Sequence, residues 1–263
     1  MSGEHAVTDC DFRVVKTDRD PFPHVVKSEF LEPELYARIK AKYPQIPKSG
    51  REGRTGYDLY RGDAGYDELM ADEDWGRLFN ALNSQDFVDY IAAQFADVLT
   101  QSKIAGKTLR FVDVVETREL LTRPEGFLGP GDKLEEIFVR IDVQQGHPGY
   151  QIPMHCDYGR RVASMILFFC DQQDCGMVGG EFNLHKENVG LFNRPMFNQG
   201  VLSRGPFRKL PKGGVVKTQP PRDNTVLIFP GMRKSFHSVS PLVKTNKPRD
   251  FLYVGVSSRA NIW

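Results

Sequence analysis

The chain has 263 residues, of which 40% are hydrophobic, so it is long enough to bury a substantial core as one domain. Its 35 lysine and arginine residues nearly balance its 34 aspartate and glutamate residues, which gives no electrostatic reason to expect nucleic acid or a membrane surface as a partner. No apolar run approaches the length that crosses a bilayer, and the first residues lack the pattern of a secretion signal. We therefore expect a single domain over residues 1–263, located in the cytoplasm.

The cysteines also fit the reducing environment of the cytoplasm. Cys10, Cys156, Cys170 and Cys175 form no CxxC pair, and a chain of this size does not need disulfides to be stable. Cys170 and Cys175 flank a polar segment that is typical of a turn. We interpret both as small buried apolar residues with reduced thiols.

Residues 1–105 are expected to be mostly helical and to support the rest of the chain. A proline in the first turn and acidic neighbours predict a helix that begins at Glu32-Pro33-Glu34. Leu35, Ile39 and Tyr43 then recur at a spacing of four residues, which places them on one face of that helix.

Three further segments of this part have recognisable patterns. The segment Asp20–Lys27 is punctuated by prolines and gives way to a short strand. The segment Ser49–Glu68 is rich in glycine and charge, which favours an exposed loop. A second helical region is predicted over Trp75–Leu99, with a break and a new N-cap at Asn83-Ser84-Gln85-Asp86.

After Gln101 the pattern changes to short segments rich in β-branched and aromatic residues, separated by Gly, Pro and Asp clusters. Such a succession predicts an antiparallel sandwich or barrel of jelly-roll type over residues 106–263, so the fold class is mainly β with N-terminal helices. The predicted strands are Thr108–Glu116, Glu136–Gln144, Ala163–Cys170, Gly180–His185, Gly214–Thr218, Thr225–Phe229 and Phe251–Ser257.

The stretch Met154-His155-Cys156-Asp157-Tyr158 carries the first sign of chemistry. In an extended segment residues i and i+2 point to the same face, so His155 and Asp157 can present an imidazole and a carboxylate to one ion while Cys156 points away. A third ligand must come from elsewhere, and His237 is the best candidate. Two imidazoles and one carboxylate form the facial triad of non-heme Fe(II) oxygenases, which leaves open positions on the metal.

A lone His-x-Asp occurs by chance in many proteins, so the argument rests on several motifs in order. His155-x-Asp157 is followed by Gly179-Gly180-Glu181-Phe182-Asn183-Leu184, then by Phe229-Pro230-Gly231 leading to His237-Ser238-Val239-Ser240-Pro241, and finally by Arg249. With these motifs the chain resembles the Fe(II)- and 2-oxoglutarate-dependent dioxygenases, in particular the branch similar to prolyl 4-hydroxylases. The entry segment near Pro21 is also similar to that of many bacterial members.

The resemblance implies a double-stranded β-helix, a cupin-like jelly roll, with His155, Asp157 and His237 as ligands of Fe(II). It implies an enzyme that couples oxidative decarboxylation of 2-oxoglutarate, using O2, to hydroxylation of an unactivated C–H bond. Halogenases of this family carry Gly or Ala in place of the aspartate, so the intact Asp157 favours hydroxylation. Desaturation, epoxidation or ring formation remain open with the same ligands.

The resemblance also implies an anchor for the distal carboxylate of 2-oxoglutarate. Arg249 suits this role because its guanidinium makes two parallel hydrogen bonds to a carboxylate and stays charged. Lys247 is a rival, since the spacing after the second histidine varies in the family. Tyr150 is expected to border the co-substrate pocket.

The sequence carries less information about the substrate than about the metal site. The segment 186–217 is strongly basic, which indicates either a lid that attracts an anionic substrate or a solvated surface loop. Arg140, Arg160 and Arg161 flank the metal motif and are candidates to meet a substrate carboxylate.

Four functions stay open at this point, one of which is a binding or regulatory module that keeps the fold without turnover, against which the intact ligands argue. A small-molecule substrate such as an amino acid or a biosynthetic intermediate is the preferred one. A prolyl or other residue on a protein or carrier-bound peptide is the alternative within the same class. A cupin-type isomerase or dioxygenase would use the metal triad but would have no need for an anchor at Arg249.

Overall fold

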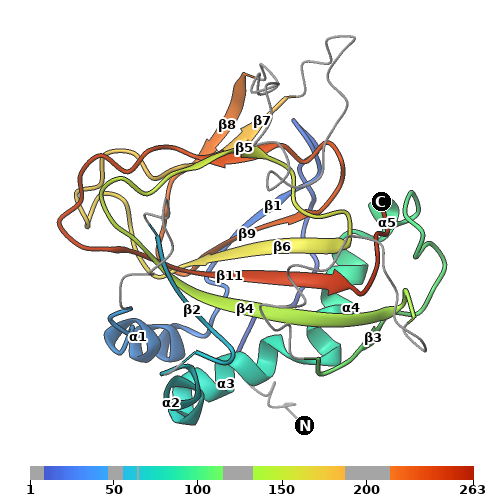
Figure 1. Cartoon of the computed structure of the whole chain (residues 1–263), viewed down its shortest axis with the longest axis horizontal. Helices are drawn as coiled ribbons and strands as arrows, with labels where there is room; N and C mark the ends of the chain where they lie inside the picture. Colours follow the sequence, from blue (N-terminus) through green and yellow to red (C-terminus); the bar gives the residue numbers. More distant parts are fainter. Residues whose placement is uncertain (1–8, 47–55, 64, 115–132, 187–213) are drawn as a thin grey trace, which may run out of the picture.

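Two β-sheets face each other, and a layer of helices covers the outer face of the larger sheet (Figure 1). The computed structural model describes residues 9–46, 56–63, 65–114, 133–186 and 214–263, and the structural statements below concern these residues. The predicted insert 186–217 therefore lies mostly outside the described part of the chain.

The larger sheet has seven strands in the order β1-β9-β6-β11-β4-β2, with β3 beside β4. Its neighbours pair antiparallel, apart from the short parallel pairing of β3 with β4. The strands are β1 (Val25–Ser28), β2 (Gly56–Tyr60), β3 (Arg110–Phe111), β4 (Glu136–Gly146), β6 (Arg161–Phe168), β9 (Thr225–Pro230) and β11 (Arg249–Ser258).

The smaller sheet has four antiparallel strands in the order β5-β10-β7-β8. They are β5 (Ile152–His155), β7 (Phe182–His185), β8 (Val215–Gln219) and β10 (His237–Val239). From β4 to β11 the chain passes back and forth between the two sheets, which confirms the mainly β, jelly-roll prediction.

The helices are α1 (Pro33–Ala41), α2 (Tyr66–Ala71), α3 (Glu73–Leu82), α4 (Gln85–Gln94) and α5 (Ala96–Leu99). Side chains at the first turns satisfy backbone N–H groups that have no partner within the helix. Glu32 accepts hydrogen bonds from the N–H groups of Glu34 and Leu35, and Ser84 accepts one from Phe87. The predicted helix starts at residues 32–34 and 84–86 are thus confirmed.

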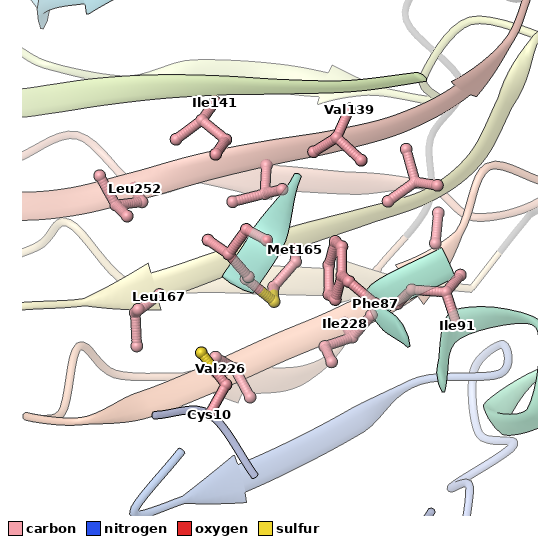
Figure 2. Packing of buried hydrophobic residues seen from close by; sticks show 14 of the residues in the cluster. Cys10, Phe87, Ile91, Val139, Ile141, Met165, Leu167, Val226, Ile228 and Leu252 are labelled. Carbon is pink, nitrogen blue, oxygen red and sulfur yellow. The ribbon is translucent and has the colours of Figure 1, made fainter. Parts of the chain in front are cut away.

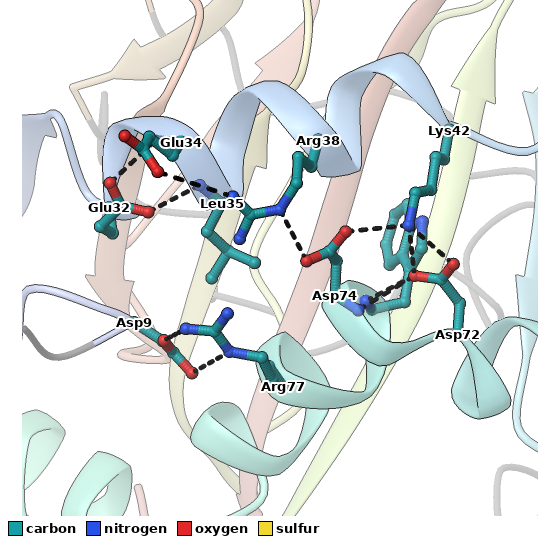
Figure 3. A network of polar contacts seen from close by, with 10 residues as sticks. Asp9, Glu32, Glu34, Leu35, Arg38, Lys42, Asp72, Asp74 and Arg77 are labelled. Carbon is teal, nitrogen blue, oxygen red and sulfur yellow. Dashed lines mark hydrogen bonds and ion pairs between the residues drawn. The ribbon is translucent and has the colours of Figure 1, made fainter.

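A network of ion pairs joins α1 to the start of α3 (Figure 3). Asp74 accepts a hydrogen bond from Arg38 on Oδ1 and one from Lys42 on Oδ2, each at 2.9 Å. Lys42 also contacts Asp72, the N-cap of α3, at 2.9 Å. Because the basic side chains are partly exposed, each pair contributes little free energy, and the network mainly fixes how the two helices are placed.

The two faces of the larger sheet serve different purposes. Along β11, Leu252, Val254 and Val256 belong to the hydrophobic core beneath the helices, whereas Phe251 packs between the two sheets. Figure 2 shows how this core combines side chains of the sheet with Phe87 and Ile91 of α4. The alternation follows from the two-residue period of a strand. The face under the helices therefore forms the main hydrophobic core, and the face toward the smaller sheet is available for a binding site.

The segment 49–68 departs from the sequence prediction. We expected an exposed loop, but Gly56–Tyr60 forms β2 at the edge of the larger sheet, and α2 begins at Tyr66. The pairing of β2 with β4 satisfies its backbone, and Leu59 is buried. A five-residue strand with an acidic residue in its middle has only a weak hydrophobic pattern. Because glycines and charged residues surround it, the sequence favoured a loop there instead of a strand.

The remaining predictions concern short strands, the cysteines and membrane-spanning helices. The strand predicted over 108–116 is limited to Arg110–Phe111 within the described residues, and the short strands β5 and β10 were not predicted as strands. All four cysteines are buried and free, which confirms the reading of Cys170 and Cys175. None of the helices in the described part of the chain is both long and apolar enough to span a bilayer.

Candidate active site

A cavity of about 440 Å³ opens between the two sheets. It is lined by His155 and Asp157, by His237, and by Arg249, which come from three separate parts of the sequence. The fold thus brings together the three predicted metal ligands and the predicted co-substrate anchor.

The two histidines lie opposite each other on adjacent strands. His155 ends β5 and His237 begins β10, and they are cross-strand partners with 4.2 Å between their ring centroids. Asp157 follows the end of β5, and its Oδ1 lies 3.7 Å from Nε2 of His155 and 3.8 Å from Nε2 of His237. These three ligand atoms lie within 4.8 Å of one another, within reach of a single ion.

Backbone carbonyls set the tautomer of both imidazoles. Nδ1 of His155 lies 2.8 Å from the carbonyl oxygen of Pro153, and Nδ1 of His237 lies 2.9 Å from that of Ser235. A carbonyl only accepts, so each Nδ1 carries the proton, and Nε2 of each neutral ring, 3.7 or 3.8 Å from Oδ1 of Asp157, keeps its lone pair. A metal ligand needs this free nitrogen, and a hydrogen bond from the other nitrogen is typical of metal-binding histidines.

Asp157 is held by one of its two oxygens. Ser164 on β6 donates its hydroxyl proton to Oδ2 of Asp157, while Oδ1 is the oxygen near the histidines. The Ser164 hydroxyl oxygen in turn lies 3.1 Å from the phenol oxygen of Tyr253 on β11. A polar chain therefore runs from the larger sheet to the carboxylate, and it fixes the orientation of that carboxylate.

Electrostatics keep Asp157 and His237 in the forms that bind a cation. Burial acts to raise the pKa of Asp157, but the electrostatic interactions with His237, His155 and Arg161 and the hydrogen bond from Ser164 outweigh it and hold that pKa below its ordinary value. Burial, with repulsion from His155, lowers the pKa of His237 to about 4. Near neutral pH the carboxyl is therefore ionised and the His237 imidazole is neutral, the states that metal ligation requires.

Arg249 lies deep in the same cavity, with only 1% of its surface exposed. Its Nε donates to the carbonyl oxygen of Gly180 at 2.8 Å, and its guanidinium carbon lies 4.3 Å from the centroid of the Phe251 ring. Its Nη1 is buried and has no hydrogen-bond partner among the described residues. A buried cationic donor without an acceptor indicates a place for an anionic ligand, since leaving such a group unpaired is costly.

The Gly179-Gly180 motif positions this arginine. Both residues have positive φ, +83° and +82°, which favours glycine. A Cβ on Gly179 would lie 1.8 Å from the carbonyl oxygen of Pro241, and one on Gly180 would lie 3.4 Å from Cδ of Arg249. The glycines allow the chain to approach closely enough for the Gly180 carbonyl to hold Nε of Arg249.

The rival anchor lies elsewhere. Lys247 is exposed and does not line the cavity, whereas Tyr150 is buried in its wall, with its ring 5.6 Å from the guanidinium carbon of Arg249. The geometry thus favours Arg249 over Lys247, and it places Tyr150 beside the anchor.

The three arginines named as substrate candidates are placed differently. Arg140 and Arg161 line the cavity, and their guanidinium carbons lie 5.8 Å and 5.6 Å from the ring centroid of Tyr253. Arg160 is not among the lining residues, and its guanidinium lies over the ring of Tyr158 at 5.5 Å.

Sequence reasoning missed Ser164 and Tyr253. Ser164 is the one polar residue between Val162 and Phe168 on β6, and a polar residue inside an apolar strand next to a metal motif was a usable signal. Tyr253 lies four residues after Arg249, so strand alternation places both on the same face. What the sequence lacks is the register between the strands, which pairs Tyr253 with Ile166 and brings its hydroxyl to Ser164.

No family model matches this chain, and no curated protein sequence matches it. Solved structures do match. A prolyl-4-hydroxylase from Pseudomonas putida is 13% identical with a TM-score of 0.51, over 89% of this chain and 92% of that chain. The non-heme alpha-ketoglutarate-dependent epimerase SnoN from nogalamycin biosynthesis is 10% identical with a TM-score of 0.50, over 89% and 78%. A 2OG-Fe(II) oxygenase family protein from Burkholderia pseudomallei is 17% identical with a TM-score of 0.46, over 91% and 85%.

At these identities the likeness establishes the fold. The chain has the jelly-roll fold of the 2-oxoglutarate- and Fe(II)-dependent oxygenases, as the motifs predicted. A shared fold does not define an activity, so function must be argued from the site itself.

Proposed function

We propose that the protein is an Fe(II)- and 2-oxoglutarate-dependent oxygenase. The observation that carries the proposal is the presence, in one cavity, of a two-histidine, one-aspartate cluster and a buried arginine donor without an acceptor. The first matches the donor set of a non-heme Fe(II) centre, and the second matches the need of a dicarboxylic co-substrate.

The residues fit both groups. Nε2 of His155, Nε2 of His237 and Oδ1 of Asp157 would hold Fe(II), and Nη1 of Arg249 would bind the distal carboxylate of 2-oxoglutarate. Bound there, iron with 2-oxoglutarate and O2 supplies the oxidising chemistry, in which the co-substrate is converted to succinate and CO2 and a substrate C–H bond is oxidised.

The chain itself would bind, orient and exclude water. The carbonyls of Pro153 and Ser235 hold the protons on both Nδ1 atoms, so the histidines need no rearrangement to bind a cation. Phe182 and Phe229 pack against the His237 ring, with centroid distances of 5.2 Å and 4.6 Å, and restrict water on that side. A preorganised metal site requires ligands that are held in a fixed orientation and shielded from water.

Arg249 separates this proposal from a cupin-type enzyme that uses no 2-oxoglutarate. Such an enzyme would need the triad but would have no use for a cationic donor buried beside Phe251 and Tyr150. Burial of an unpaired guanidinium costs free energy, which a carboxylate ligand would recover.

For the substrate we propose a small molecule, with hydroxylation as the outcome. Supporting this, the 440 Å³ cavity must hold both the co-substrate and the substrate, which leaves limited room beside the metal ligands. Hydroxylation of a prolyl or other residue on a peptide is the alternative that the test must include.

The test is succinate formation by protein purified without oxygen, loaded with Fe(II) and exposed to O2 and 2-oxoglutarate. Wild type should form succinate, with faster turnover when a panel of amino acids, other small acids and prolyl peptides supplies the right substrate. His155→Ala should abolish it, because one imidazole is lost from the triad. Iron binding without any succinate across the panel would overturn the proposal in favour of a cupin-type or non-catalytic protein.

A further inference from the structure

Arg161 is a second buried guanidinium in the cavity, and it is distinct from the anchor. It is 1% exposed and lines the cavity wall at the start of β6. Its Nη1 donates to the hydroxyl of Ser257 at 2.7 Å, while its Nε is buried and has no hydrogen-bond partner among the described residues. Its charge helps to lower the pKa of Asp157, but no carboxylate among the described residues forms an ion pair with it.

The backbone is shaped to receive this side chain. A Cβ on Gly255 would lie 1.9 Å from Nη1 and 2.5 Å from the guanidinium carbon of Arg161, so only glycine leaves the space that the guanidinium fills. Gly231 is equally close, since its Cβ would lie 2.4 Å from the carbonyl oxygen of Arg161. Glycines on β11 and after β9 thus hold Arg161 across the inner face of the larger sheet.

Arg161 and Arg249 cannot serve the same small carboxylate. Arg249 begins β11, and the Arg161 guanidinium lies over Gly255, six residues further along the same strand. The guanidinium carbon of Arg249 lies 4.3 Å from the Phe251 ring centroid, whereas that of Arg161 lies near Gly255 and 5.6 Å from the Tyr253 ring centroid. The cavity wall therefore has two cations at separate places along β11.

The charges inside the cavity single out Arg161. Arg140 makes two hydrogen bonds to Asp142, at 2.8 Å and 2.5 Å, so this pair largely neutralises itself. Asp157 belongs to the metal cluster, and Arg249 to the co-substrate. Arg161 is the remaining cation of the wall, and it lies on the other side of Tyr253 from Arg249.

We propose that Arg161 binds a carboxylate of the substrate, with Arg140 and Tyr253 forming the adjoining wall, so that the substrate is a small organic acid such as a free amino acid. This inference rests on the proposed function, because it assigns Arg249 to 2-oxoglutarate. A guanidinium suits the role because it offers its remaining donors in a fixed plane to a carboxylate. The substrate would then be held at the end of the cavity away from the co-substrate.

The test uses full-length protein loaded with Mn(II), which takes the place of Fe(II) without oxidation, and with 2-oxoglutarate. Pairs of free amino acids and their amides, which differ in the carboxylate alone, are titrated by ligand-observed NMR. At least one acid should bind wild type about 10-fold or more tighter than its amide, the range expected for charge-assisted hydrogen bonds. Arg161→Gln should remove that preference, and Arg161→Lys should retain part of it.

The controls separate the possible outcomes. Arg160→Gln, at the neighbouring arginine outside the cavity lining, should keep the preference of wild type. Binding of 2-oxoglutarate to the Mn(II) protein is measured first, so a failure of the proposed function is seen before any acid is added. Equal binding of every acid and its amide by wild type would overturn the inference without any variant. An acid preference that survives in Arg161→Gln would also overturn it and leave Arg161 a structural role beside Ser257.

Discussion

Ser164 donates a hydrogen bond to Oδ2 of Asp157 and thereby leaves Oδ1 as the oxygen that faces both histidines. Because β6 pairs with β11 and β9, this hydroxyl ties the metal cluster to the centre of the larger sheet. Partners of this kind commonly change metal affinity by about 10- to 100-fold when they are removed.

Ser164→Ala should therefore weaken Mn(II) or Fe(II) binding by about 10-fold, since the carboxylate is then free to rotate. Ser164→Thr keeps the hydroxyl and should stay close to wild type. The measurement is a metal titration against a chelator, with the thermal midpoint of the metal-free proteins compared alongside. Equal metal affinity in Ser164→Ala and wild type would show that this hydrogen bond does not orient Asp157.

Arg249→Gln should weaken 2-oxoglutarate binding roughly 100-fold, because the charge and the charge-assisted hydrogen bond from Nη1 to the distal carboxylate are lost, as is the contact of Nε with Gly180. Metal binding should be unchanged, since Arg249 is not among the clustered ligands. Lys247→Gln is the matched control, because that lysine is exposed and outside the cavity lining. The opposite result, a loss in Lys247→Gln alone, would move the anchor to the rival residue.

The lowered pKa of His237 predicts a pH dependence of stability. Burial lowers this pKa from 6.5 to about 4, so the unfolded chain takes up a proton below pH 6.5 that the folded protein resists until about pH 4. The free energy of unfolding should fall as the pH drops through this window, by about 3 kcal/mol at most for this group.

Denaturant unfolding of metal-free wild type and His237→Asn between pH 7 and pH 4.5 tests this prediction. The comparison between the two proteins matters because burial raises the pKa of Asp250 to about 6, and that group acts in the opposite direction. His237→Asn should show a smaller loss of stability on acidification than wild type. Parallel curves would mean that His237 titrates in the folded protein as it does in the unfolded chain.

Gly179→Ala should destabilise the protein by at least about 2 kcal/mol, because the residue has a φ of +83° and its Cβ would meet the Pro241 carbonyl oxygen at 1.8 Å. Gly214→Ala is the control, since a Cβ there has nothing within 4 Å. Chemical denaturation measures both. A Gly179→Ala protein as stable as wild type would mean that the turn at 179–180 can relax.

The sequence predicted the parts of the fold that depend on local patterns. Strands such as β6 and β11 are recognisable because β-branched and aromatic residues dominate them. The start of α1 is recognisable from Pro33 with its acidic neighbours, and that of α4 from Ser84, a preferred N-cap residue. Strand β2 was not recognisable, because its stability comes from pairing with β4, almost ninety residues later in the chain.

In the candidate site, too, features set by local sequence patterns were predictable, and features set by long-range strand pairing were not. The clustering of His155, Asp157 and His237 was predictable because their order and spacing along the chain are distinctive. The contact between Ser164 and Tyr253 was not, since it depends on the register of β6 against β11. The sequence already favoured Arg249 over Lys247, and the structure adds that Arg249 is buried in the cavity while Lys247 is exposed.

In the proposed function, the His155, Asp157 and His237 cluster and Arg249 form one binding site for 2-oxoglutarate. Titration calorimetry of 2-oxoglutarate into metal-free and Mn(II)-loaded protein tests this, because two parts of one site must show a coupling free energy. Mn(II) should strengthen 2-oxoglutarate binding by at least about 10-fold in wild type. In Asp157→Ala at the same Mn(II) concentration, this enhancement should be lost. Equal binding of 2-oxoglutarate with and without Mn(II) would show that the cluster and Arg249 do not form one site.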